Sequence, residues 1–127
     1  MSFTFKNRIA PFPAERLEAI SKVLADTNEG LTGTEIDHLL RNCEIPNPTP
    51  DMTKWKRLYN AFVEFQNEHQ VGNHVIVFIH RAMDPARYVG GPTIFHSRRD
   101  RLNPVLAFCG YTLGEDGKLR KANAART

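Results

Sequence analysis

The sequence predicts a single, mainly helical domain that ends in a small β-hairpin. Apolar residues recur at helical spacing along most of the 127 residues, and an Asp-Gly turn lies near the C-terminal end. A capped short helix is followed by a turn and by an amphipathic helix with basic residues at its start. This order is typical of a helix-turn-helix-like or winged-helix-like core. We expect one domain over residues 1–121 and a tail or the start of a linker over 122–127.

The first two helices have clear starting signals. Pro13 favours a helix over 13–27, because proline suits the first helical position. Thr32 and Glu35 have the spacing of a capping box, and Leu31 and Ile36 that of a hydrophobic staple. A second, short helix is therefore predicted over 33–43.

Three further helices follow the proline-rich turn. The third begins after Asp51 or Thr53 and carries a stripe of aromatic and leucine residues. Segment 74–83 fits a helix or a buried strand, and we favour the helix. The last helix begins at Pro92 and ends at Gly110, with a kink or a break expected at Pro104 and Asn103 capping a second piece.

The remaining structural expectations concern the hairpin and the core. Asp116-Gly117 predicts a two-residue turn in a hairpin over Tyr111–Lys121. The predicted core consists of Leu17, Ile20, Leu24, Ile36, Leu39, Leu40, Leu58, Phe62, Ile79, Leu102 and Leu106.

Composition narrows the class of protein. The longest apolar run, 75–79, is far too short for a membrane span, so no membrane partner is expected. Cys43 and Cys109 lie far apart and suit buried thiols in a reducing, cytoplasmic setting. Neither has a second Cys or a His at zinc-site spacing, and we expect no metal and no cofactor. Nucleophile elbows, phosphate loops and paired carboxylates are not recognisable in the sequence, which predicts a protein that is not an enzyme.

Charge indicates an anionic partner. Residues 1–79 hold eight Lys and Arg against ten Asp and Glu, whereas residues 80–127 hold nine against four. In a helix-turn-helix reading, basic residues at the start of the third helix face nucleic acid. The candidate contacts on this helix are Lys54, Lys56, Arg57 and Asn60, and those of a second patch are Arg98, Arg99, Arg101, Lys118 and Arg120. The eight-residue connection before the third helix is long for this motif, although a winged variant with a basic hairpin tolerates it.

Two other interpretations stay open. The basic surfaces are equally consistent with an ordinary solvated face of a three-helix core. Alternatively, the chain is a protein interaction or oligomerisation module, in which Trp55, Tyr59 or Tyr88 is an exposed anchor.

Several motifs resemble the N-terminal region of the bacterial Ymh family. They are Leu31-Thr32-Gly33-Thr34-Glu35-Ile36, Thr53-Lys54-x-Lys56-Arg57-Leu58, Ala82-Met83-Asp84-Pro85-Ala86-Arg87-Tyr88 and Arg99-x-x-Leu102-Asn103. The resemblance covers roughly residues 15–121, with departures at Trp55 and Pro104. It implies a module that precedes an effector domain in bacterial or phage conflict. The Arg-Asn-Pro-x-x-His motif of that effector does not occur in this sequence.

Overall fold

The computed structural model describes residues 7–122, and within them the chain is mainly helical with a small two-stranded hairpin, as predicted. The elements are α1 (Ala14–Leu24), α2 (Gly33–Asn42), α3 (Lys54–His69), α4 (Asn73–Ala82), the 3₁₀ helix η1 (Pro85–Tyr88), α5 (Pro92–Ala107), β1 (Tyr111–Leu113) and β2 (Leu119–Lys121). No helix in this described part is long and apolar enough to cross a membrane. Of the predicted tail, only Ala122 lies within the described residues.

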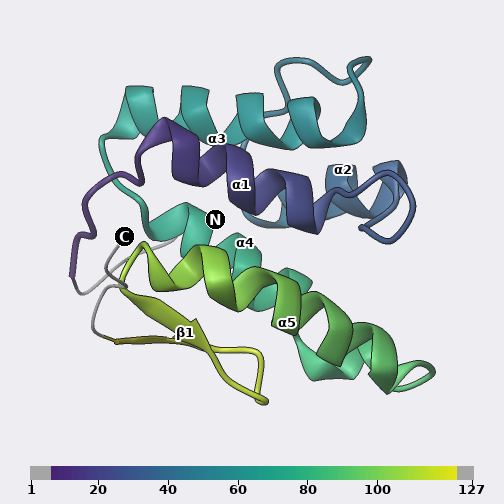
Figure 1. Ribbon diagram of the computed structural model, residues 1–127. Coiled ribbons are helices and arrows are strands. Elements are labelled where there is room, and N and C mark those ends of the chain that lie inside the picture. Colours follow the sequence, from purple (N-terminus) through teal and green to yellow (C-terminus); the bar gives the residue numbers. More distant parts are fainter. Residues whose placement is uncertain (1–6, 123–127) are drawn as a thin grey trace.

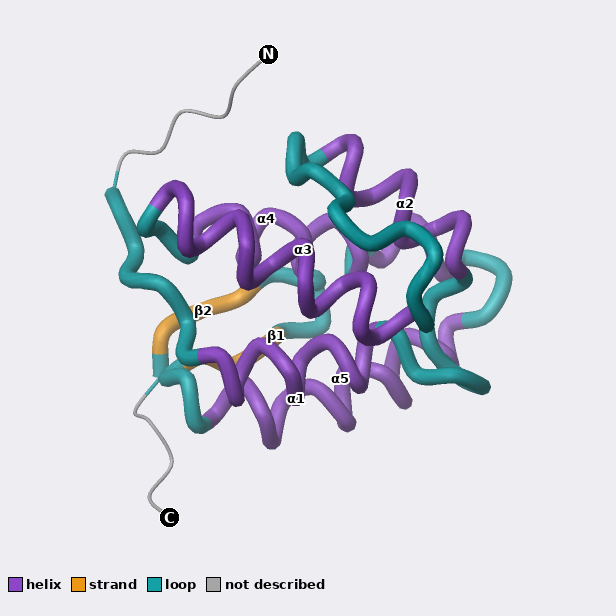
Figure 2. The backbone as a smooth tube through the Cα atoms, turned by 90° about the horizontal axis from the view of Figure 1, so that it is seen from above, coloured by secondary structure: helices purple, strands orange, loops and turns teal. Residues whose placement is uncertain are grey.

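Helix α1 lies at the centre of the packing. It contacts α3 on one side and α5 on the other, although α5 comes much later in the chain. Figure 1 shows α3 above α1 and the hairpin below α5. Seen from above, α1 and α5 overlap along their length (Figure 2). Helix α2 contacts α3 and α4, so all five helices share one apolar interior.

All the predicted core residues are buried. They are Leu17, Ile20, Leu24, Ile36, Leu39, Leu40, Leu58, Phe62, Ile79, Leu102 and Leu106. Phe62 of α3 meets Phe78 of α4 edge to face, with the ring centroids 5.1 Å apart. This geometry suits the opposite charges of the ring face and the ring edge. The helical spacing of apolar residues therefore identified the main packing faces correctly.

The predicted capping box at the start of α2 is confirmed. The backbone N–H of Glu35 donates to the Thr32 hydroxyl at 3.1 Å, and the N–H of Thr32 donates to the Glu35 carboxylate at 2.9 Å. Both bonds satisfy donors that the first turn of a helix leaves without partners.

Segment 74–83 is helical, which confirms the favoured alternative, and the helix begins one residue earlier at Asn73. The Asn73 side chain binds the backbone of residues 7 and 9: its Oδ1 accepts from Ile9 N at 2.8 Å, and its Nδ2 donates to Asn7 O at 2.7 Å. Gln66 of α3 binds both backbone groups of Phe12, each at 3.0 Å. Two buried amides thus fix the segment before α1.

Of the two alternatives expected at Pro104, a kink or a break, the break is wrong, because α5 continues through Pro104 to Ala107. Proline removes only one backbone donor, and packing of the helix against α1 and β1 supports its continuation. Asn103 does not cap a second piece. Its side chain accepts from Leu113 N at 2.7 Å and donates to Leu113 O at 3.2 Å, which fastens the hairpin to α5.

The two-residue turn predicted at Asp116-Gly117 is also wrong. Leu113 pairs with Leu119, so residues 114–118 separate the strands. Gly114 N donates to Lys118 O at 3.0 Å, which leaves a loop of three residues, 115–117, inside this bond. Gly117 N donates to Gly114 O at 3.0 Å, and Gly117 has φ 76°. A turn followed by a left-handed glycine is the usual geometry of a three-residue hairpin loop. The Asp116-Gly117 pair therefore predicted the presence of a hairpin correctly, but it predicted the wrong number of residues in the hairpin loop.

The two cysteines are free. Cys43 is buried and Cys109 is half-buried. Burial raises the pKa of the Cys43 thiol to about 11, so this thiol stays protonated at neutral pH. Burial of Cys43 agrees with the prediction, whereas Cys109 is more accessible than expected.

Candidate functional site

Most of the candidate contact residues on α3 bind other parts of the chain. Lys54 Nζ donates to the carbonyl oxygens of Leu31 and Thr27, at 2.9 and 3.3 Å. Arg57 forms an ion pair with Asp37 at 3.1 Å and donates to two backbone carbonyls. Asn60 donates to the hydroxyl of Thr49 at 3.2 Å. These three side chains hold the start of α2 and the loop before α3.

Lys56 differs from these three residues. It is exposed, and its Nζ lies 5.9 Å from the centroid of the Trp55 ring. It forms no ion pair with any residue of the described range 7–122. Lys56 is therefore the α3 candidate whose charge stays available to a partner.

The predicted second patch does not form one surface. Arg99 Nε donates to Leu113 O at 2.9 Å, and Arg120 forms an ion pair with Asp116 at 2.6 Å. Lys118 is exposed on the hairpin, whereas Arg98 and Arg101 line a pocket on α5. Figure 1 shows the hairpin and α3 on opposite sides of the molecule, with α1 and α5 between them. The two predicted patches thus face different directions.

The pocket that contains Arg98 and Arg101 has a volume of about 750 Å³. We name it the arginine pocket. It is lined by the α1–α2 loop over 28–30, by Glu35 of α2, by Arg87 and Tyr88 of η1, by Gly90 and Gly91, and by Thr93, Ile94, Ser97, Arg98 and Arg101 of α5. The α5 residues recur at intervals of three and four, so they form one helix face.

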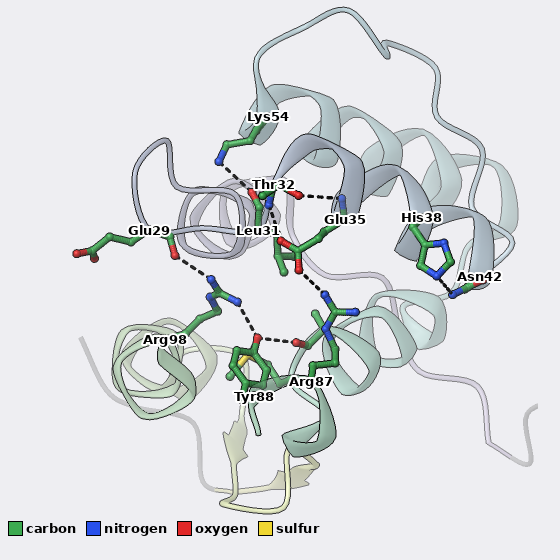
Figure 3. Close-up of polar contacts among 12 residues, drawn as sticks. Glu29, Leu31, Thr32, Glu35, His38, Asn42, Lys54, Arg87, Tyr88 and Arg98 are labelled. Atoms are coloured by element: carbon green, nitrogen blue, oxygen red, sulfur yellow. Dashed lines mark hydrogen bonds and ion pairs between the residues drawn. The ribbon is translucent and has the colours of Figure 1, made fainter. Parts of the chain in front are cut away.

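Arg98 is the central residue of this pocket. It is 8% exposed, and its guanidinium donates to the Tyr88 hydroxyl at 2.7 Å and to Glu29 O at 2.8 Å. Figure 3 shows it between these two groups. No carboxylate of residues 7–122 forms an ion pair with it. Both hydrogen-bond partners of the guanidinium within residues 7–122 are therefore neutral oxygens.

Arg87 is held by the residue that caps α2. Its Nη2 donates to Glu35 Oε2 at 2.7 Å, while Oε1 of the same carboxylate accepts from Thr32 N (Figure 3). Burial raises the pKa of Glu35, but hydrogen bonds from Thr32 and the charges of Arg87 and Arg98 outweigh it, and the net pKa is lowered. Glu35 is therefore ionised and fixes Arg87 at the pocket wall.

Arg101 is paired across the pocket rim. Its guanidinium lies 3.3 Å from Asp26 and 3.2 Å from Glu29. Hydrogen bonds from the backbone N–H groups of Glu29 and Asn28 lower the pKa of Asp26. The nearby Arg101 guanidinium lowers this pKa as well. The acidic residues of the first half of the chain thus neutralise Arg87 and Arg101 of the basic second half.

The N-terminus of α5 opens onto the same pocket. Gly91 is its N-cap residue, and no side chain caps the helix. The N–H groups of Gly90 and Thr93 form no hydrogen bond with any other residue between 7 and 122. Free amides at a helix start carry partial positive charge and bind anions. Helix α5 thus adds to the positive character of the pocket.

The aromatic residues predicted as exposed anchors of an interaction module are buried or half-buried. Tyr88 is buried at 8% exposure, because its hydroxyl bonds to Ala82 O and Arg98, so its prediction as an exposed anchor is wrong. Trp55 and Tyr59 are half-buried against the core. Val89 and Ile94 are the exposed apolar residues beside the pocket, at 82% and 53%.

Sequence reasoning missed most of the arginine pocket. Glu35 was recognised only as a cap, and Arg87 only within a motif of the family resemblance. Arg87 and Glu35 lie 52 residues apart, and Arg98 and Glu29 lie 69 apart. Contacts between residues so far apart cannot be predicted from the spacing of residues within a short sequence segment. The one usable signal was Gly90-Gly91-Pro92, a turn that starts a helix without a capping side chain.

No cluster of metal-ligating side chains occurs within residues 7–122. The chain matches no protein-family model, no curated protein and no solved structure.

Proposed function

We propose that the chain is a non-catalytic recognition module that binds an anionic group of its partner in the arginine pocket. The observation that carries this proposal is the position of Arg98. Within residues 7–122, its buried guanidinium donates hydrogen bonds to a phenol oxygen and a backbone carbonyl but to no carboxylate, inside a pocket of about 750 Å³. A buried charge is costly unless an opposite charge compensates it. An anion from a partner supplies that compensation.

The surroundings of Arg98 support the same proposal. Tyr88 and the Glu29 carbonyl hold the guanidinium in place before any ligand arrives, which lowers the entropic cost of binding. The free N–H groups at the start of α5 offer further donors. Arginine donates in a planar fork that matches a carboxylate or a phosphate.

The test is a two-dimensional ¹H–¹⁵N NMR titration of the full chain with inorganic phosphate and, separately, with acetate. We expect saturable shifts of the backbone amides of Gly90, Gly91 and Thr93 and of the Arg98 side-chain N–H. Arg98→Lys keeps the charge but loses the fork, and we expect it to weaken binding by about tenfold.

The matched control is Lys56→Met, which removes one positive charge from α3 outside the pocket. It is expected to leave the phosphate titration unchanged. Chemical-shift changes that spread over all lysine and arginine residues and do not saturate with added phosphate would contradict the proposal. Such changes indicate general ionic screening of positive charges rather than binding at one site.

A second candidate function is nucleic-acid binding through a helix-turn-helix-like or winged-helix-like surface. The observation in its favour is that Lys56, Lys118 and Lys121 are exposed and form no ion pair within residues 7–122. The resemblance to the N-terminal region of the Ymh family agrees with a recognition role of this kind. Each phosphate contact should steepen the salt dependence of binding.

This second candidate is tested by fluorescence polarisation with labelled double-stranded DNA, single-stranded DNA and RNA across a salt series. Lys56→Glu and Lys118→Glu should each weaken binding if their surfaces contact phosphates. Unchanged affinity in both variants, for every nucleic acid that binds, removes this candidate.

A further inference from the structure

We infer that the partner of the arginine pocket is an acidic peptide segment in which one carboxylate lies next to an apolar side chain. This inference rests on the proposed function, because it names the chemical class of the anion that the pocket binds. Three properties of the pocket carry it: its charge balance, the apolar residues beside it, and the open backbone at Gly90.

The pairing of charges in the pocket favours a single negative charge. The lining holds Arg87, Arg98 and Arg101 against Glu29 and Glu35, and Asp26, next to the lining, pairs with Arg101 as well. Arg87 and Arg101 already pair with carboxylates, which leaves one guanidinium for a ligand. The Glu29 side chain is 70% exposed at the rim, and a nucleic-acid strand would bring further phosphates close to it. Like charges at this distance repel, so one carboxylate fits better than a polyanion.

Apolar surface lies directly beside the charged pocket. Val89 is 82% and Ile94 is 53% exposed, and they flank the turn at Gly90 and Gly91. The described chain has only two other large exposed hydrophobic residues, Met52 and Phe108. Two of the four thus flank one turn. Apolar contact beside a buried arginine is a combination found at the centres of protein interfaces.

The backbone at Gly90 is open to an approaching chain. A Cβ atom added to Gly90 would meet no atom within 4 Å, whereas one added to Gly91 would lie 3.2 Å from the Ile94 side chain. The N–H groups of Gly90 and Thr93 have no partner within residues 7–122 and can donate to a peptide carbonyl. An extended segment can therefore place its carboxylate at Arg98 and its apolar side chain against Ile94.

The experiment selects a displayed library of random 12-residue peptides against the full chain, with two variants of an exposed pocket residue as comparators. Ser97→Glu places a carboxylate in the pocket, and Ser97→Gln is its neutral match in shape. We expect selected peptides to share an Asp or Glu beside Leu, Ile, Val or Phe. Synthetic copies should bind Ser97→Glu at least about tenfold more weakly than Ser97→Gln.

A change of the shared Asp to Asn, or of Glu to Gln, in the synthetic peptide should weaken its binding by about tenfold. Enriched peptides without a common acidic residue, or equal binding to both Ser97 variants, overturn the inference. A 12-residue oligothymidine that binds at the pocket more tightly than any selected peptide also overturns it, yet leaves the proposed anion site standing. If Ser97→Glu alters the binding of no anion, phosphate included, both proposals fail.

Discussion

The Tyr88 hydroxyl lies 2.7 Å from the Arg98 guanidinium and 2.7 Å from the carbonyl oxygen of Ala82 at the end of α4. Because the hydroxyl donates its one proton to Ala82, its lone pairs are directed at Arg98. One side chain thus connects the end of α4 with the charged centre of the pocket. The guanidinium also lies 5.6 Å from the centroid of the Tyr88 ring.

Tyr88→Phe should therefore lower the free energy of unfolding by about 1–3 kcal/mol, because it leaves the Arg98 donor and the Ala82 carbonyl acceptor without the hydroxyl that binds both. The measurement is urea denaturation followed by circular dichroism. Phosphate binding should weaken as well, since Arg98 loses one of its two fixed contacts. A variant as stable as the original chain would show that the hydroxyl contributes nothing to the network.

Ser21→Ala should raise stability. Ser21 lies on α1, is fully buried, and its hydroxyl has no hydrogen-bond partner among residues 7–122. Removing a buried hydroxyl without a partner recovers its desolvation cost, and alanine is the better helix former. We expect a gain of about 1 kcal/mol in urea denaturation. Ser21→Val is a comparison variant that also removes the hydroxyl but adds side-chain volume. A loss of stability in Ser21→Ala would contradict the claim that the buried hydroxyl destabilises the fold.

His80 should make stability depend on pH. Its Nε2 accepts from Leu119 N at 3.0 Å, which requires the neutral ring. Burial lowers the pKa of His80 below its usual 6.5, and the charge of Lys118 lowers it further, against the effect of Asp116. The unfolded chain then binds the proton more readily than the folded chain. The stabilisation is complete above about pH 6.5 and is lost as the pH falls toward the lower folded pKa.

The measurement compares urea denaturation at pH 7.5 and pH 5.5 for the original chain and for His80→Gln. Gln offers an acceptor that does not titrate, so this variant should lose less stability on acidification. His74 also has a lowered pKa, because of its burial, and remains as a shared background in both proteins. An equal loss in the two proteins would contradict the role given to His80.

Gly117→Ala should destabilise the hairpin and the domain. Gly117 has φ 76°, and a Cβ atom there would overlap the carbonyl oxygen of Met83 at the end of α4. Left-handed backbone and a backbone overlap together should cost about 2 kcal/mol or more. Gly90→Ala is the matched control, since its Cβ atom would meet nothing within 4 Å. Thermal denaturation should separate the two variants clearly.

Local features of the fold could be predicted because their causes are local. The Thr32–Glu35 capping box needs only four consecutive residues, and the buried stripes need only helical periodicity. The break considered at Pro104 and the length of the hairpin turn were predicted wrongly, since contacts with distant residues decide them. Asn103 binds Leu113 rather than capping a helix, and Gly117 packs on Met83.

The candidate site was harder to predict for the same reason. Basic side chains at the start of α3 look alike in the sequence, yet Lys54 and Arg57 bind backbone carbonyls while Lys56 is exposed. Arg98 looked like a surface charge, and only the tertiary packing of α5 against the α1–α2 loop buries it. Charge counted along the sequence does not tell which cations already have partners.

The most direct test of the anion site is the affinity of inorganic phosphate for Ser97→Glu compared with Ser97→Gln, measured by NMR titration. Ser97 is exposed and lines the arginine pocket, so either side chain should be tolerated by the fold. We predict that Ser97→Gln binds phosphate within about threefold of the original chain, and that Ser97→Glu binds at least about tenfold more weakly. Equal affinities, or no saturable binding by the original chain, would contradict the claim that this pocket recognises anions.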